Sequence, residues 1–127
     1  MAPLKYYHLV PEADWRSCVE HGKAYFPATY EADGFTHLSD NREVLLTIGN
    51  HFCKQISGAF LVLVIEPSKL TSEVKLEPAA PVGKIEAHET APDQLYPHCY
   101  GPLDLASVEK ELRVQRAEDG SFVSLTE

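Results

Sequence analysis

Six histidines are the residues of this chain whose chemistry stands out. Three of them, His8, His37 and His98, fall on expected strands or beside a proline, where the backbone can aim an imidazole in a fixed direction. An imidazole both donates and accepts hydrogen bonds near neutral pH, so such a cluster could orient a polar ligand or move a proton. The remaining histidines lie beside turns or on an expected helix and are interpreted as exposed: His21, His51 and His88.

The spacing of these residues favours neither a metal site nor a thiol nucleophile. Zinc sites with three histidines usually contain a short pair such as His-x-x-x-His, whereas the histidines here are all ten or more residues apart. No metal is therefore expected. Cys99 follows His98, but neighbouring side chains on an extended backbone point to opposite sides, so Cys99 is interpreted as a packed apolar residue. The glycines form neither a Walker loop nor a G-x-G-x-x-G fingerprint.

Glu77 is a further candidate, because it ends the expected strand 74–77 directly before Pro78. The ordinary interpretation of a glutamate is an exposed carboxylate. The functional interpretation is a general base or an acceptor for a ribose hydroxyl. The residues alone favour the first.

The composition of the chain limits its partners. The 127 residues fit one domain spanning 1–127, and 11 Lys plus Arg against 19 Asp plus Glu give a net charge of −8. This balance argues against a long nucleic-acid groove, although a local cationic pocket remains open. A small-molecule ligand is the expected partner, and the oligomeric state is left open.

The apolar and cysteine patterns indicate a cytoplasmic protein with reduced thiols. The longest apolar run, 59–65, has the length of a strand and is far short of the roughly 20 residues of a membrane helix. The N-terminus has no secretory signal pattern. The three cysteines form no C-x-x-C pair, so neither a disulfide framework nor a zinc ribbon is expected.

Hydrophobic periodicity predicts an α+β domain of short strands and two or three short helices. Ser39 or Asp40 is expected to cap the second helix. The apolar run is expected in the middle of a covered sheet. The predicted elements are strands at 5–10, 35–39, 59–65 and 74–77, helices at 12–21, 42–54 and from Asp104 through Leu112, a loop at 78–93 with a strand near 82–85, and a hairpin of 113–117 with 121–125.

Five segments of the chain form a recognisable pattern. The most specific are the boxes Gly34-Phe35-Thr36-His37-Leu38-Ser39 and Pro97-His98-Cys99-Tyr100-Gly101-Pro102-Leu103. The others are Tyr7-His8-Leu9, the segment 61–67 and Val74-Lys75-Leu76-Glu77-Pro78. In their order along the chain, these segments resemble the DUF952 family, which comprises small proteins of unknown function. The resemblance covers nearly the whole chain.

This resemblance implies a fold similar to that of the ADP-ribosyltransferases, a split antiparallel or mixed β-sheet that clasps NAD between its halves. Tyr7-His8 is similar to the Tyr-His that opens many of those domains. His37-Leu38-Ser39 is similar to the His-Leu-Ser of RNA 2′-phosphotransferases. The implied function is an NAD-dependent ADP-ribosyl- or phosphotransferase-like enzyme with a histidine-lined cleft, and the implied cofactor is NAD.

The resemblance also implies roles for individual residues. The implied catalytic set is His8, His37, Glu77 and His98, and the implied cofactor-binding set is His8, Ser39, Arg42 and Tyr100. In this interpretation His8 and Ser39 hold ribose hydroxyls, and His37 orients the pyrophosphate or the substrate. Glu77 polarises the ribose, while His98 and Tyr100 close the cleft. Arg42 is the arginine nearest to Ser39 in the sequence that could bind a phosphate.

Two alternatives stay open at this point. The first is a non-catalytic module on the same fold that binds a small nucleotide-like or anionic ligand through the same histidines. The second is a purely structural domain in which the histidines serve packing and hydrogen bonding. A shared pocket for the histidines would favour the enzyme or the binding module.

Overall fold

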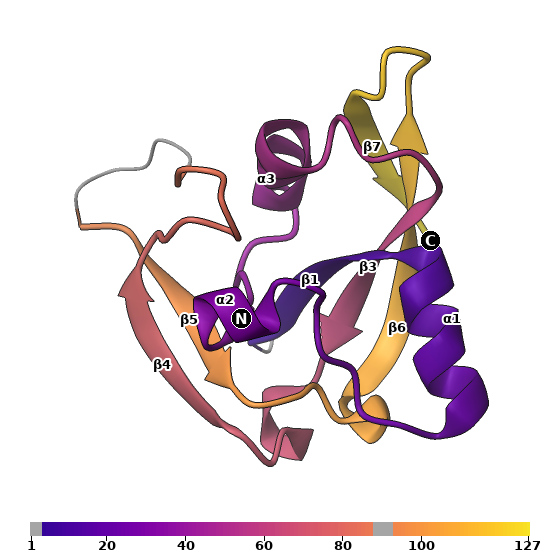
Figure 1. Ribbon diagram of the computed structural model, residues 1–127. Helices are drawn as coiled ribbons and strands as arrows, with labels where there is room; N and C mark the ends of the chain where they lie inside the picture. The colour runs from indigo at the N-terminus through magenta and orange to yellow at the C-terminus, as the bar shows by residue number, and fades with distance from the viewer. Residues whose placement is uncertain (1–3, 88–92) are drawn as a thin grey trace.

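The chain folds as two antiparallel sheets with short helices packed against them (Figure 1). The computed structural model describes residues 4–87 and 93–127. The larger sheet has the strand order β1-β3-β6-β7 and the smaller β2-β5-β4. The elements are β1 (Tyr6–Pro11), α1 (Glu12–His21), α2 (Tyr30–Asp33), β2 (Thr36–His37), α3 (Val44–Phe52), β3 (Phe60–Ile65), η1 (Pro67–Lys69), β4 (Glu73–Pro78), β5 (Leu95–Tyr100), η2 (Leu105–Ser107), β6 (Val108–Arg116) and β7 (Phe122–Thr126).

Strand β3 lies between β1 and β6 and is buried along its whole length, as its unbroken apolar run predicts. Its alternate residues serve two cores. Phe60, Val62 and Val64 pack with apolar residues of α3, β6 and β7. Leu61, Leu63 and Ile65 pack instead with residues of α1 and β5. The strand thus carries a core on each face because successive side chains point to opposite sides.

The smaller sheet places two histidines opposite each other. In the antiparallel pairing of β2 with β5, Thr36 faces Cys99 and His37 faces His98. Directly opposed residues share a face. Thr36 and Cys99 are fully buried on one face, so His37 and His98 project from the other.

A backbone bridge joins the two sheets next to this histidine pair. The amide of Tyr7 donates to the carbonyl of Ser39 at 2.7 Å, and the amide of Ser39 donates back at 2.9 Å. The bridge ties β1 to the segment that follows β2. It therefore brings His8, which follows Tyr7, beside His37.

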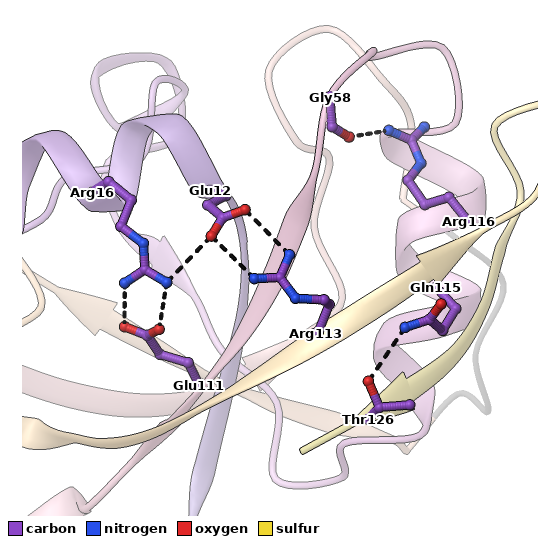
Figure 2. A network of polar contacts seen from close by, with 8 residues as sticks. All are labelled: Glu12, Arg16, Gly58, Glu111, Arg113, Gln115, Arg116 and Thr126. Carbon is purple, nitrogen blue, oxygen red and sulfur yellow. Dashed lines mark hydrogen bonds and ion pairs between the residues drawn. The ribbon is translucent and has the colours of Figure 1, made fainter.

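Helix α1 is fixed to β6 by a network of charged side chains (Figure 2). Glu12 accepts hydrogen bonds from Arg16 and from Arg113. Glu111 accepts from Arg16 at 2.9 Å and from the indole of Trp15 at 2.7 Å. Exposed ion pairs contribute little free energy each, so we assign this network the role of orienting the helix.

Most predicted elements are confirmed. The run after Asp104 is an exception, because Leu105–Ser107 forms only a 3-10 turn and Val108–Arg116 is strand β6 rather than a helix. The spacing of Leu105, Val108 and Leu112 fits a helix, but Leu112 and Val114 also alternate with exposed residues, and pairing with β3 selects the strand.

Three smaller predictions also differ from the structure. The helix after β2 has Glu43 at its N-cap, so neither Ser39 nor Asp40 caps it. Val82 and Ile85 form an isolated bridge rather than a strand. All strand pairs among the described residues are antiparallel, so the sheets contain no mixed pairing there.

Candidate functional site

An apolar cavity of about 230 Å³ lies between β1, the segment 25–29, α3 and the turn at 82–85. Its wall is mostly aromatic and aliphatic, and its polar side chains include His8, His37 and Asp14. Asp14, Ile56 and Ile85 line the cavity and are exposed, so the cavity reaches the surface.

A second, smaller cavity of about 40 Å³ adjoins the first at His37. His98 and Tyr96 line it together with Ile48 and Phe52 of α3. His37 therefore stands in the wall between the two spaces. The histidines that sequence reasoning selects come together at one site, with His8 at the first cavity and His98 at the second.

His8 is a deeply buried residue of the first cavity, with 7% of its surface exposed. Its Nδ1–H donates to the carbonyl of His37 at 2.6 Å. Burial lowers the pKa of His8 to about 4, so the ring is neutral at pH 7 and Nε2 carries a lone pair. Among the described residues, this Nε2 is the one buried side-chain nitrogen or oxygen without a hydrogen-bond partner.

His37 is held by Asp33, four residues earlier in the chain. Gly34 ends α2 in a left-handed conformation at φ 82°, and the reversal lets Asp33 turn toward His37. The Nε2–H of His37 donates to Oδ2 of Asp33 at 2.9 Å, while Oδ1 of Asp33 accepts from the amide of Gly83. Burial lowers the pKa of His37, and the Asp33 hydrogen bond opposes that effect.

His98 is held in a similar way by Glu77 of the neighbouring strand β4. The Nδ1–H of His98 donates to Oε1 of Glu77 at 3.0 Å, and the hydroxyl of Tyr100 donates to the same oxygen. The Phe35 ring stacks on His98 with centroids 4.0 Å apart. Burial lowers the pKa of His98, partly offset by Glu77. The Tyr100 and His98 hydrogen bonds hold the pKa of Glu77 below its usual range.

The three imidazoles therefore follow one pattern. Each donates one ring N–H to an oxygen acceptor of the protein, which leaves the other ring nitrogen of the neutral imidazole with a lone pair. Together they present acceptors rather than charges. Such a site suits a hydrogen-bond donor, or a proton taken up in a reaction.

Four of the predicted site residues line neither cavity: Ser39, Arg42, Glu77 and Tyr100. Glu77 contacts His98, which lines the second cavity, and Tyr100 contacts Glu77. The Ser39 hydroxyl is fully buried and bonds to the backbone of Asn41. Arg42 is exposed, and its Nε lies 3.6 Å from Oε1 of Glu43. These positions support a structural role for Ser39 and a surface role for Arg42.

Sequence reasoning misses Asp33 and Phe35, which position the histidines. The sequence pattern places Asp33 only in a turn, and because no helix spans Asp33 and His37, nothing in the sequence links the two. Phe35 precedes His37 by two residues, which is the spacing of neighbours on one face of a strand. Asp14 lies in the first turn of α1, and nothing in the sequence links it to the cavity.

Within residues 4–87 and 93–127, no group of three His, Cys, Asp or Glu side chains has a geometry that could hold a metal ion. No helix in the part of the chain that the structure describes is long and apolar enough to cross a membrane.

The fold and the site together define a small α+β protein with a histidine-walled cavity. The chain belongs to the DUF952 family, described as proteins of unknown function, whose model matches residues 9–111. No curated protein matches the chain.

Solved structures of the protein CC0527 from Caulobacter crescentus resemble this one. Its crystal structure, and that of a double mutant of the same protein, are each 24% identical, cover 94% of this chain and 93% of that chain, and superpose with a TM-score of 0.70. The solution NMR structure of CC0527 is 26% identical over 91% of this chain and 89% of that chain, with a TM-score of 0.55. These likenesses establish the fold.

Proposed function

We propose that this protein binds a small, ring-sized, largely apolar molecule in the first cavity and that Nε2 of His8 accepts a hydrogen bond from it. The unpartnered Nε2 is the observation that carries the proposal. A buried acceptor without a partner costs about 1–3 kcal/mol. A ligand that donates a hydrogen bond to this nitrogen removes that cost. The site therefore selects ligands that carry a hydrogen-bond donor.

The size and lining of the cavity support this class of ligand. An apolar cavity of roughly 150 Å³ accepts benzene in an engineered protein, and the cavity here is about 230 Å³. The aliphatic and aromatic wall would bury a ring, and the small number of polar groups in the wall would fix the orientation of that ring. A substituted single ring or a small bicyclic ring fits these conditions.

The charges of the lining favour a binding module over an NAD-dependent enzyme. Phosphate groups in proteins are usually bound by Arg, Lys or backbone amides. No lysine or arginine among the described residues lines either cavity. The proposed ligand is therefore a hydrogen-bond donor without a diphosphate, rather than an anion.

The NAD-dependent ADP-ribosyl- or phosphotransferase-like activity is our second candidate. It is supported by Glu77, because Tyr100 and His98 favour the ionised form of this carboxylate beside the histidine pair. A carboxylate held in this way could polarise a ribose, as the ADP-ribosyltransferase resemblance implies. In this candidate His8 contacts the nicotinamide ribose.

NMR titration of the histidine side chains separates the two candidates. We expect phenol or indole to shift the His8 ring signals, and we expect His8→Leu to weaken that binding about tenfold or more, since it removes the acceptor. His21→Gln, at an exposed helical histidine, is the control. A folded protein whose His8 signals ignore millimolar phenol, indole and nicotinamide contradicts the first proposal. Release of nicotinamide from NAD selects the second.

A further inference from the structure

We infer that the ligand of the first cavity carries a protonated amine and that the carboxylate of Asp14 at the cavity rim is its counter-ion. This inference rests on the proposed function, because it specifies the ligand of the same cavity. It combines two separate observations, the acceptor character of every histidine at the site and an unpaired carboxylate at its entrance.

Asp14 is placed where a bound ligand would meet it. It lies in the first turn of α1, is exposed, and lines the cavity. Its charge acts on the cavity wall, since it contributes to the raised pKa of Tyr25, which burial chiefly causes. Asp14 and His8 therefore border the same cavity.

Asp14 differs from Glu12 and Glu111, the two carboxylates of the network between α1 and β6, in having no cation. Glu12, two residues earlier, is paired with Arg16 and Arg113. Glu111 is paired with Arg16. Among the described residues, no ion pair or hydrogen bond engages Asp14, so its charge is available to a ligand.

The buried end of the cavity points to the same class of ligand. Nε2 of His8 is an unpartnered acceptor in a side chain that is 7% exposed. A carboxylate or phosphate ligand would place acceptor against acceptor there and would be repelled by Asp14. A ring that donates to His8 and extends an ammonium group toward Asp14 satisfies both ends. The net charge of −8 adds long-range attraction for cations.

The Tyr25 ring adds a surface for such a cation. Tyr25 lies in the cavity wall, and its ring centroid is 5.7 Å from that of His8. An ammonium group within about 6 Å of an aromatic centroid is attracted by the ring. Tyr25 thus adds an aromatic ring to the wall that His8 and Asp14 also line.

Three probes with the same ring and different head groups test the inference. They are tyramine, 2-(4-hydroxyphenyl)ethanol and 3-(4-hydroxyphenyl)propionate, whose shared phenol hydroxyl can donate to Nε2 of His8. Each is titrated against the full chain while the His8 ring signals are followed by NMR. We expect the amine to bind more tightly than the alcohol, and the carboxylate to bind most weakly. An exposed ion pair contributes only a modest free energy and is screened by salt. The expected preference for the amine is therefore roughly two- to fivefold, and it decreases with added salt.

Asp14→Asn is the decisive variant, and Glu20→Gln, an exposed carboxylate change on the same helix, is its matched control. We expect Asp14→Asn to abolish the preference for the amine over the alcohol, and Glu20→Gln to keep it. Equal affinities for amine and alcohol in the wild type, or an unchanged preference in Asp14→Asn, overturn the inference and leave the proposed function standing. If none of the probes, and neither phenol nor indole, shifts His8, the proposed function fails as well.

Discussion

His37 and His98 lie directly opposite each other on β2 and β5, with ring centroids 5.5 Å apart. The antiparallel register alone places them on one face of the smaller sheet. His8 reaches the same site through the backbone bridge between Tyr7 and Ser39. Strand pairing and this bridge therefore gather three histidines that are distant in the sequence.

Replacing His8 with leucine should change stability little. The change removes a hydrogen bond to the His37 carbonyl, which costs about 1 kcal/mol. It also removes the buried, unpartnered Nε2, which offsets that loss. We expect the free energy of unfolding at pH 7.5, measured by denaturant titration, to change by less than about 1 kcal/mol.

Leu63→Ala is the matched control in the core. Truncating this fully buried leucine should lower the free energy of unfolding by about 2–5 kcal/mol. A loss of similar size in His8→Leu would show that His8 is a structural residue of the core. Unchanged stability with lost ligand binding would be the behaviour of a site residue.

Stability should fall as the pH decreases from about 6.5 to 4. The folded pKa of His8 is about 4 against an ordinary value of 6.5. In this range the unfolded chain takes up a proton that the folded chain excludes, so protonation favours unfolding. The lost stability is on the order of 3 kcal/mol for this residue.

Burial lowers the pKa of His37 and His98 as well, so both add to the loss. The contribution of His8 is isolated by comparing the wild type with His8→Leu at pH 7.5 and pH 4.5. We expect the variant to lose less stability over this range. Parallel stability curves would contradict the assignment of a low pKa to His8.

Glu77→Gln should lower the pKa of His98 further. Glu77 raises this pKa by accepting the Nδ1–H hydrogen bond and by its negative charge, against the larger effect of burial. The amide of glutamine keeps the shape but not the charge. The pKa is measured by NMR titration of the His98 ring, and an unchanged or raised value would show that the Glu77 contact does not persist in solution.

Asp33→Asn should destabilise the wall of the first cavity. Asp33 is nearly buried and joins His37 to the amide of Gly83. The substitution leaves at least one of these donors poorly paired, which should cost about 1–3 kcal/mol of unfolding free energy. Amide exchange should also accelerate at Gly83. Asp93→Asn changes an exposed aspartate elsewhere in the chain. It should neither lower the free energy of unfolding nor accelerate amide exchange at Gly83.

The sequence predicts those parts of the fold that depend on local pattern. The helix that Gly22 ends and the buried strand at 60–65 follow from periodicity and from capping. The strand at Val108–Arg116 does not, because its apolar spacing also fits a helix and only the partner strand β3 decides between them. Local pattern carries no information about such pairing.

The same limit applies to the site. Residue type and position on rigid elements are enough to select His8, His37, Glu77 and His98, which the structure brings together in pairs. The cavity itself is not predictable, because its wall combines α3 with residues 25–29 and 82–85. Ser39 and Arg42 come from the resemblance alone, and their side chains serve a turn and the surface.

The nitrogen-15 chemical shifts of the His8 ring test the central claim most directly. They report which nitrogen carries the proton and whether the other accepts a hydrogen bond. The account predicts Nδ1 protonated and Nε2 unprotonated at pH 7 in the free protein, with Nε2 shifting toward hydrogen-bonded values when phenol or tyramine saturates the cavity. A protonated Nε2, or an Nε2 shift that stays constant while the ligand demonstrably binds, would contradict it.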